Sequence, residues 1–330
     1  MLNSRKHLSL TSAGLLILMT AAAGCSSSKP ADTAPAPTGS AAPAAQTPPA
    51  ATGKLKIGYL APDLGNQFWV RVANGVKDEA AKQGIDAQVL DAHTDPQAQV
   101  NQAENLVSQK VNAIIVSPWD TDTGSQVVAI ARKANIPVFV ADIGSKDTNY
   151  TSFVVSDNYQ GGVKAADLLA KVAKGKSVAV LELQAGSVVA GQRHVGFKDQ
   201  AKKVGLNIVA SQPADSQRSL GMSVMENMLT AHPDIAGVFA DNDEMALGAL
   251  QALEAAGKSD IPVIGFDANG DALKAINDGK MLATMAQFPE KMGATSVQNA
   301  VKAAKGEKVE KDVKLDVEVV TKDNVAQFLK

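Results

Sequence analysis

The sequence predicts an α/β protein made of two similar doubly wound lobes, each built on a parallel sheet. Two observations support this fold class. From Lys54 onward, short apolar runs alternate with amphipathic segments of about a dozen residues, the pattern of strands and helices in covered parallel sheets. The strands fall into two sets of five, and a short motif recurs in both sets.

The expected strands are short apolar runs bounded by polar or turn residues. They are Leu55–Leu60, Ala87–Leu90, Ala113–Val116, Val138–Ala141 and Phe153–Val155 in the first half, and Val178–Leu183, Ile208–Ser211, Gly237–Ala240, Val263–Phe266 and Leu282–Ala286 in the second. The expected helices are Phe68–Lys82, Pro96–Gln109, Ser125–Ala134, Tyr159–Lys174, Val189–Val204, Ser219–Ala231, Met245–Ala256 and Lys291–Lys305.

The recurring motif runs Ile-Pro, then a strand, then Asp. It occurs at Ala134–Asp142 and again at Ser259–Asp267. Proline at the first residue of a strand costs no ladder hydrogen bond and stops the preceding helix. The repeat favours two related lobes over a single TIM barrel, which offers no reason for an Asp at matching places.

Length and composition are those of an ordinary globular protein. A chain of 330 residues with 45% apolar and 20% charged residues can form two domains with a large core. The formal net charge of −2 predicts no nucleic-acid partner. After the N-terminal segment there is no apolar run of membrane-spanning length, so no transmembrane helix is expected.

The N-terminal segment predicts export. Arg5 and Lys6 precede an apolar stretch, Leu15–Met19, and a small-residue cleavage region that ends at Gly24. Residues 1–24 are therefore expected to be a signal peptide. Cys25, the only cysteine, follows as in the bacterial lipoprotein processing site, although Ala22 stands where that site more often has Leu. A signal peptide with a chance cysteine is the alternative.

Residues 25–53 are expected to be a lipidated, disordered linker. Ser26–Gly53 is a tract of Ser, Pro, Ala and Thr that has too few large apolar groups to pack. Fully extended, it could reach roughly 90 Å from a membrane. The protein is therefore expected outside the cytoplasm, tethered by lipid at Cys25.

Four consecutive polar residues, Asp241–Glu244, join an apolar strand to a helical pattern within Val238–Leu250. In an open α/β sheet such a junction lies at the carboxyl edge, where ligands bind. Asn242 is the candidate contact there. The alternative is that Asn242 or Asp241 only caps the following helix, a position that both residue types favour.

Other strand ends carry polar or aromatic residues of the same kind. The candidates are Asn66, Phe68, Trp69, Ser117, Asp142, Arg193, Asn242, Asp267 and Gln287. Carboxylates accept hydrogen bonds from adjacent hydroxyls, the Arg fork donates to others, amides do both, and aromatic rings cover the C–H faces of a sugar. This set suits a neutral polyhydroxylated ligand.

Each candidate also has a purely structural explanation. Phe68 and Trp69 could be core residues, Asp142 and Asp267 could cap loops, and Arg193 could be a solvated helix residue. Their shared place at strand ends favours the binding interpretation.

Motifs for catalysis are missing from the sequence. It has no phosphate-binding loop, dinucleotide fingerprint, nucleophile elbow or H-E-x-x-H motif, and its four histidines are scattered without metal-ligand spacing. We therefore expect no enzyme activity, no cofactor and no metal site.

Several stretches resemble the ribose-type periplasmic sugar-binding proteins of ABC transporters, which have the type I periplasmic binding protein fold. They are Val154–Asn158, Ser211–Asp215, Leu229–Leu250, Ala255–Asp260, Val263–Asp267 and Ala283–Gln287. The resemblance runs from about Lys56 to the C-terminus.

The resemblance implies roles for individual residues. Asn66, Phe68, Trp69 and Asp142 match sugar-contacting positions of the first lobe, and Arg193, Asn242, Asp267 and Gln287 match those of the second. Ser117, Ile143 and Ser216 stand where the ribose binder has Asn, Arg and an aromatic residue. A missing partner leaves a sugar hydroxyl unpaired at about 1–3 kcal/mol, so a sugar or polyol is expected, but ribose itself is not assured.

The resemblance also implies a three-strand hinge, with crossovers near Ser156-Asp157, Gln287-Phe288 and Leu315–Val317. It assigns residues 54–156 plus 288–316 to an N-terminal lobe and 157–287 plus 317–330 to a C-terminal lobe. Ligand in the cleft would stabilise a closed form of this monomer, which an ABC permease in the membrane would recognise.

Three other functions remain as alternatives. A binding protein that serves a chemotaxis or signalling receptor would use the same closed lobes. The effector domain of a sugar-responsive repressor shares the fold but requires a DNA-binding helix-turn-helix before the first strand. An enzyme on a doubly wound sheet would need the reactive groups that the sequence lacks.

Overall fold

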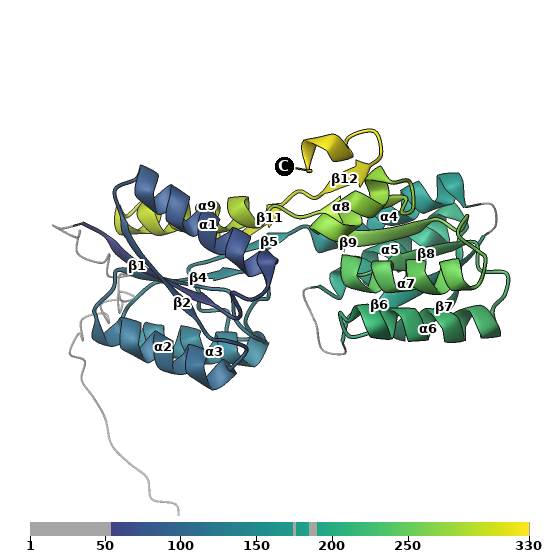
Figure 1. Cartoon of the computed structure of the whole chain (residues 1–330). Helices are drawn as coiled ribbons and strands as arrows, with labels where there is room; N and C mark the ends of the chain where they lie inside the picture. The colour runs from purple at the N-terminus through teal and green to yellow at the C-terminus, as the bar shows by residue number, and fades with distance from the viewer. Residues whose placement is uncertain (1–53, 174–175, 185–189, 330) are drawn as a thin grey trace, which may run out of the picture. The chain divides into compact units, whose positions relative to one another are not determined.

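The computed structural model describes residues 54–173, 176–184 and 190–329 (Figure 1). Their architecture is two α/β lobes, each with a mainly parallel six-stranded sheet, as the sequence predicts. The expected signal peptide, the lipidation site at Cys25 and the linker lie outside the described residues.

The first sheet has the strand order β11-β5-β4-β3-β1-β2, and its neighbouring strands are parallel. Its strands are β1 (Lys56–Ala61), β2 (Asp86–Asp91), β3 (Ala113–Val116), β4 (Val138–Ala141), β5 (Ser152–Ser156) and β11 (Asp312–Leu315).

Two helices cover each face of this sheet. Figure 1 shows α1 (Gln67–Lys82) and α9 (Pro289–Ala304) on one side, and α2 (Pro96–Ser108) and α3 (Thr121–Lys133) on the other. Because side chains alternate along a strand, both faces are apolar. Tyr59 and Ile115 pack with the first pair of helices, whereas Leu60 and Ile114 pack with the second.

The second sheet has the order β12-β10-β9-β8-β6-β7. Its strands are β6 (Ser177–Glu182), β7 (Asn207–Pro213), β8 (Gly237–Ala240), β9 (Val263–Asp267), β10 (Ala283–Ala286) and β12 (Glu318–Thr321). The edge strand β12 runs antiparallel to β10, which differs from the all-parallel expectation.

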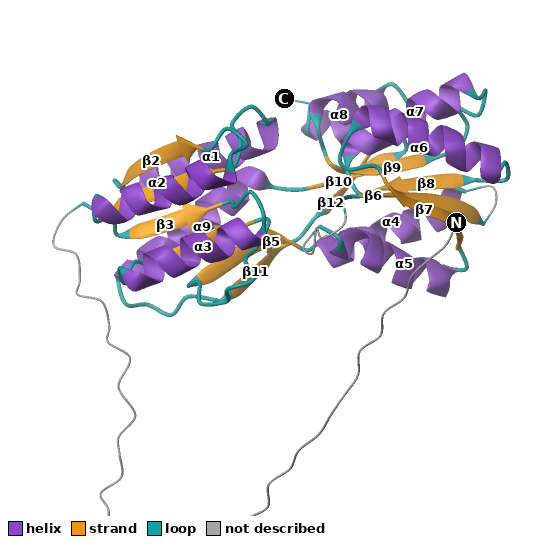
Figure 2. Ribbon diagram, turned by 90° about the horizontal axis from the view of Figure 1, so that it is seen from below, coloured by secondary structure: helices purple, strands orange, loops and turns teal. Residues whose placement is uncertain are grey.

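The helices of the second lobe again lie on both faces of the sheet, as Figure 2 shows. They are α4 (Asn158–Val172) and α5 (Gln192–Val204) on one face, and α6 (Arg218–Ala231), α7 (Asp243–Ala255) and α8 (Gly270–Asn277) on the other; a short 3-10 turn, η1, covers Val325–Gln327. Strands β11 and β12 and helix α8 were not predicted from the sequence.

The chain passes between the two sheets three times. It leaves the first sheet after β5, returns after β10 to form α9, and crosses again between β11 and β12. These are the places where the sequence analysis expects the hinge. The residue-level lobe boundaries remain a prediction.

Polar residues at strand ends start several of the helices. Asn66 and Asn242 are the N-caps of α1 and α7, and each side chain accepts a backbone N–H of the first turn. Asp120 caps α3 in the same way. Since parallel strands bring their carboxyl ends to one edge of a sheet, these junctions place polar groups at that edge.

Candidate functional site

Arg193 is the centre of the polar groups at the carboxyl edge of the second sheet. It lies in the first turn of α5 and is buried. Its Nε donates to Asn158 Oδ1 at 2.8 Å, and its Nη1 donates to the main-chain oxygen of Asp241 at 2.6 Å. The guanidinium also lies over the Phe266 ring, 3.8 Å from the centroid. A cation held by these contacts is fixed in orientation.

Asp267 is the acidic partner of Arg193. Its Oδ1 accepts from Arg193 Nη1 at 3.3 Å and from Gln287 Nε2 at 2.7 Å. Gln287 is buried and accepts in turn from the Ser156 hydroxyl at 2.7 Å. Ser156 ends β5 and Gln287 follows β10, so this chain of hydrogen bonds joins Asp267 to two of the crossovers between the sheets.

Asp142 and Asp267 hold equivalent places in the two sheets, each at or just after the end of the strand that follows an Ile-Pro step. Both have a left-handed backbone, with φ of 71° and 117°. Non-glycine residues rarely adopt this conformation, and such residues cluster at functional sites. The repeat seen in the sequence therefore coincides with a repeated, strained strand end.

The carboxyl groups of the site share a crowded electrostatic environment. Desolvation raises the pKa of Asp142 to about 6, against an opposing effect of Arg193 and with a further increase from Asp267. Desolvation also raises the pKa of Asp267, and Arg193 and Gln287 oppose it. Because charges of the second sheet act on Asp142 of the first, the carboxyl edges of both sheets contribute to one field.

Asn242 is buried, and its side-chain oxygen accepts the N–H of Met245 at 3.0 Å. The capping role considered from the sequence is therefore real. Its amide nitrogen makes no hydrogen bond to a residue that the structure describes. Arg193 Nη2 likewise has no partner among those residues. These two groups are therefore donors without a partner in the described part of the chain.

The residues predicted after the first strand occupy two environments. Asn66 is exposed and its side chain caps α1 by accepting from Phe68 N at 2.9 Å. Phe68 and Trp69 are half-buried against the core of the first lobe, and their rings meet edge to face with centroids 4.8 Å apart. The core role weighed from the sequence thus accounts for part of each ring surface.

Ser117 is fully buried in this structure. Its hydroxyl accepts a hydrogen bond from Tyr59 at 3.1 Å, and its main-chain oxygen accepts from Gln99 Nε2 at 2.9 Å. Gln99 also accepts the N–H of Trp119 at 2.9 Å, so it holds both ends of this short segment. Trp119 itself is 41% exposed.

A pocket of about 520 Å³ lies between the loop after β1 and the loops around α7 and α8. It is lined by Asp63, Gly65, Asn66, Gln67, Glu244, Asn269, Gly270 and Asp271. Asn269 N–H donates to Asp243 Oδ2 at 2.7 Å, which connects the pocket wall to the buried polar groups behind it. Its volume is that of a small-molecule site.

Comparison with known proteins shows the family. A model of the periplasmic binding protein domain matches residues 57–308. The chain belongs to the periplasmic binding protein family.

Named relatives show which type of periplasmic binding protein this is. The ribose import binding protein of Escherichia coli (strain K12) is 42% identical over 274 residues, covering 82% of this chain and 92% of the relative. The ribose import binding protein of Bacillus subtilis (strain 168) is 40% identical over 269 residues, covering 81% and 88%. This periplasmic binding protein is therefore of the ribose-type, sugar-binding and not enzymatic, and it is extracytoplasmic.

Solved structures agree with the fold. An ABC transporter solute-binding protein from Bacillus halodurans C-125 with bound myo-inositol has a TM-score of 0.74 at 36% identity, covering 84% of this chain and 98% of that one. A periplasmic solute-binding protein from Actinobacillus succinogenes 130z with bound D-allose has a TM-score of 0.77 at 31% identity, covering 83% and 100%.

Sequence reasoning missed several residues that hold the site of this periplasmic binding protein together. Asp243 is fully buried and accepts from the Thr284 hydroxyl and from Asn269 N–H, both at 2.7 Å. Desolvation and the nearby Asp267 raise its pKa well above the ordinary value. Asp243 is one of the polar residues Asp241–Glu244, and Asn158 belongs to a stretch that resembles the family. Both therefore lie in segments that the sequence analysis singled out, but the sequence does not show which residues they bond.

Ser117, Ile143 and Ser216, the three residues that differ from the ribose-type pattern, lie in different environments. Ser117 is buried as described above. Ile143 is partly exposed directly after Asp142, and its N–H donates to Ala141 O at 3.1 Å. Ser216 has a left-handed backbone, with φ of 62°, and its hydroxyl donates to Gln184 at 3.3 Å.

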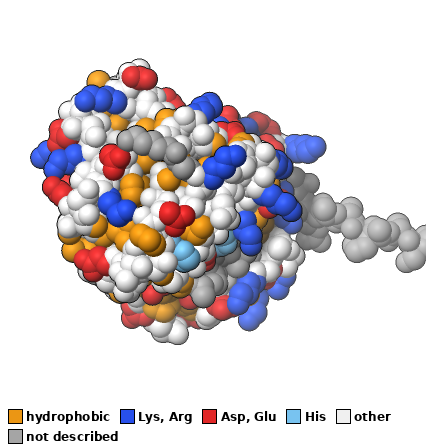
Figure 3. Space-filling model, turned by 90° about the vertical axis from the view of Figure 1, so that its right-hand side faces the viewer, with side chains coloured by type: hydrophobic (Ala, Val, Ile, Leu, Met, Phe, Trp, Pro, Cys, Tyr) orange, Lys and Arg blue, Asp and Glu red, His pale blue; other side chains and the backbone are white. Residues whose placement is uncertain are grey.

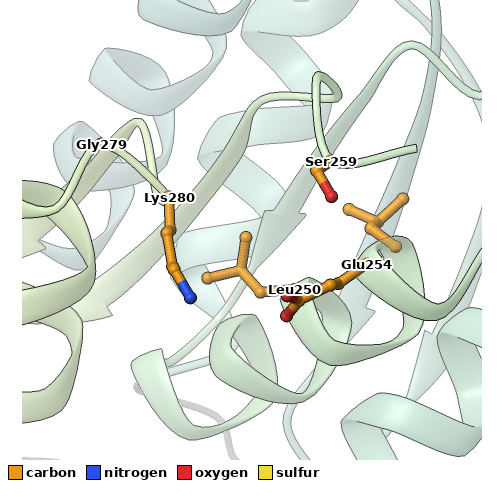
Figure 4. A pocket seen from close by; sticks show the side chains of 6 residues that line it. Leu250, Glu254, Ser259, Gly279 and Lys280 are labelled. Atoms are coloured by element: carbon orange, nitrogen blue, oxygen red, sulfur yellow. The ribbon is translucent and has the colours of Figure 1, made fainter. Parts of the chain in front are cut away.

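A second, smaller pocket of about 300 Å³ lies at the other end of the second lobe. Lys280 reaches into it from the loop before β10 and Glu254 from the last turns of α7 (Figure 4). Ser259 and Gly279 line it from segments that precede β9 and β10. The pocket therefore sits at the amino ends of the strands, away from the predicted ligand residues.

Figure 3 shows acidic side chains lying among basic ones on one face of the molecule. Within residues 54–173, 176–184 and 190–329, no helix combines the length and apolarity of a membrane span. Those residues also contain no group of three His, Cys, Asp or Glu side chains that could hold a metal ion.

Proposed function

We propose that this protein captures a neutral sugar or polyol between its lobes and delivers it to an ABC importer. The network of Arg193, Asp267 and Gln287 carries the proposal. It offers a fixed carboxylate acceptor, and two donors near it, Arg193 Nη2 and the Asn242 amide, have no hydrogen-bond partner among the described residues. Vicinal hydroxyls of a polyol match that combination of acceptor and donors.

The relatives support this ligand class. Their names and bound molecules are ribose, D-allose and myo-inositol, all neutral and polyhydroxylated. Ser117, Ile143 and Ser216 are smaller or less polar than the residues of the ribose-type pattern. These differences alter the pattern of hydrogen-bonding groups and the space at those points, so D-allose and myo-inositol are candidate ligands beside ribose.

Closure about the three crossovers is the proposed mechanism. The carboxylate of Asp142 and the side chain of Asn66 belong to the first lobe, and the Arg193 network belongs to the second. A ligand that contacts both stabilises the closed form only by its additional contacts in that form. The permease would then bind the closed form.

The test is a thermal-shift panel of the purified protein against D-ribose, D-allose, myo-inositol, other aldoses and glycerol at about 1 mM. A micromolar ligand at that excess stabilises the folded state by about 4 kcal/mol. Asp267→Ala should abolish the shift, whereas Asp199→Ala, at an exposed position of α5, should keep it. A cooperative melt with no shift from any compound would contradict the proposal.

The lipid anchor at Cys25 is a separate part of the proposal. In a bacterial cell that processes lipoproteins, the full chain should be found with the membrane fraction and Cys25→Ser should be released from it. Equal membrane association of both proteins would contradict lipid attachment at this residue.

A further inference from the structure

Two consecutive residues of α5 contact opposite ends of Asp241, which follows β8. Arg193 Nη1 donates to the main-chain oxygen of Asp241 at 2.6 Å. His194 Nδ1 lies 3.6 Å from the carboxylate Oδ2 of the same residue. Asp241 is fully buried, whereas the His194 side chain is 33% exposed. Two side chains of the first turn of α5, those of Arg193 and His194, therefore contact Asp241.

The Asp241 carboxylate has few other partners. The N–H of Leu183 donates to Oδ2 at 3.3 Å, and Oδ1 has no hydrogen-bond partner among the described residues. Desolvation raises the pKa of Asp241, and protonated His194 and Arg193 oppose that rise. A buried carboxylate without such compensation is strongly destabilising.

Further charges face this pair from neighbouring elements. Glu182 of β6 and Lys198 of α5 act on His194 in opposite directions. Asp267 at the end of β9 feels the charge of Asp241. Asp241 outweighs the others at His194, and its carboxylate, 3.6 Å from Nδ1, holds the pKa of the imidazole above the ordinary value.

The start of α5 depends on such contacts. Its N-cap is Gly191, which provides no side-chain hydrogen bond to the first turn. Gly162 of α4 packs directly against the main-chain oxygen of Arg193 and leaves no room for a Cβ. The turn that carries Arg193 is thus positioned by α4 on one side and by Asp241 on the other.

We propose that His194 and Asp241 form a positioning pair for Arg193 in ligand binding. The inference rests on the proposed sugar-binding function and adds a residue that does not itself touch the ligand. A protonated His194 balances the buried carboxylate, and Arg193 remains directed at Asp267 and the ligand. When His194 is neutral, the Asp241 carboxylate draws the Arg193 guanidinium toward itself.

The direction of the pH effect follows from this arrangement. His194 is protonated below its raised pKa, and the pair is then intact. As pH rises through that pKa, the imidazolium loses its proton and the affinity for sugar falls. This loss occurs at higher pH than the change expected from Asp142, whose pKa is about 6.

The experiment is isothermal titration calorimetry of the full-length protein with D-ribose, D-allose and myo-inositol between pH 6 and pH 9. His194→Gln should weaken binding at pH 6 by about tenfold, or about 1.4 kcal/mol, and should remove the alkaline decline. His232→Gln, at the C-terminal end of α6, is the matched control and should behave as the wild type.

Rescue separates positioning from a merely structural role. In the double variant His194→Gln/Asp241→Asn no buried charge needs balancing at this position, so affinity should return to near the wild-type value and show no alkaline decline. If His194→Gln binds with the wild-type pH profile, or if the double variant is no better than the single one, the positioning pair is wrong.

A wild type that binds none of the three compounds contradicts the proposed function for these ligands, and the pair is then tested without ligand. The imidazole titration of His194, followed by NMR, should move to lower pH in Asp241→Asn. An unchanged His194 titration in that variant overturns the pair.

Discussion

Asp142 and Asp267 occupy equivalent strand ends in the two lobes, yet their surroundings differ. Asp267 is held by Arg193 and Gln287. The Asp142 side chain makes no hydrogen bond to any residue within the described ranges. The side of the candidate site in the second lobe is therefore already held by hydrogen bonds. The side in the first lobe presents the Asp142 carboxylate, which has no hydrogen-bond partner among the described residues.

This difference indicates that the Asp142 carboxylate lowers the stability of the folded protein and is available for ligand binding. A carboxylate that is desolvated without a partner destabilises the fold, as the raised pKa of Asp142 records. A ligand hydroxyl that donates to Asp142 removes that penalty and joins the two lobes. The first lobe thus carries Asp142, which lacks a hydrogen-bond partner among the described residues. The second lobe carries the hydrogen-bonded template of Arg193, Asp267 and Gln287.

The largest expected effect comes from removing the centre of the template. Arg193→Met leaves Asp267 and the main-chain oxygen of Asp241 without their cation. Removing one partner of a buried ion pair costs about 3–5 kcal/mol, so urea unfolding followed by circular dichroism should show a loss of that size. Arg71→Met removes an exposed pair with Glu290 and should cost no more than about 1 kcal/mol. Equal losses would contradict the role given to Arg193.

A smaller effect should follow from acid. As pH falls through about 6, Asp142 binds a proton and no longer accepts from a ligand hydroxyl. Affinity should then fall by up to about tenfold per pH unit, the limit for one linked proton. Calorimetry between pH 5 and pH 7.5 measures it, and Asp142→Asn should lack the dependence. A flat wild-type profile through this range would exclude Asp142 as an acceptor.

The smallest effect is expected at the rim of the pocket. Arg218 bridges Glu244 and Asp271, at 2.9 Å and 2.8 Å, and is 35% exposed. Partly exposed ion pairs contribute about 0.2–1 kcal/mol, so Arg218→Ala should change affinity less than about fivefold. A loss as large as that of the Arg193 variant would place ligand recognition at the rim instead of at the strand ends.

The sequence predicted the fold well because its signals are local. Apolar periodicity located the strands of both sheets, and the Ile-Pro-strand-Asp repeat anticipated two equivalent strand ends. The edge strands β11 and β12 and the short α8 were missed because four to eight residues carry little periodicity. The antiparallel direction of β12 depends on its pairing with β10, which no local pattern encodes.

The site was predictable as a set of positions but not as a network. Strand ends identified Asp267 and Gln287, and Arg193 was identified in the helical segment that follows another strand. Which of these residues pair with one another, and the contact of Arg193 with Asn158, could not be predicted, because the partners come from separate segments of the chain. Ser117 shows the same limit, because its burial depends on Tyr59, 58 positions earlier in the chain.

The central claim is that Asp142 lacks a partner while Asp267 is held by Arg193 and Gln287. Its most direct test is the melting temperature of Asp142→Asn with and without the sugar that stabilises the wild type. A carboxyl pKa raised from 3.8 to about 6 means that the folded state loses stability as pH rises between those two values, and the full penalty is present at pH 7. The neutral Asn should therefore melt higher than the wild type at pH 7 without ligand, by about 2–4 °C per kcal/mol recovered, and should show a smaller ligand-induced shift. A lower melting temperature with the shift intact would contradict the account.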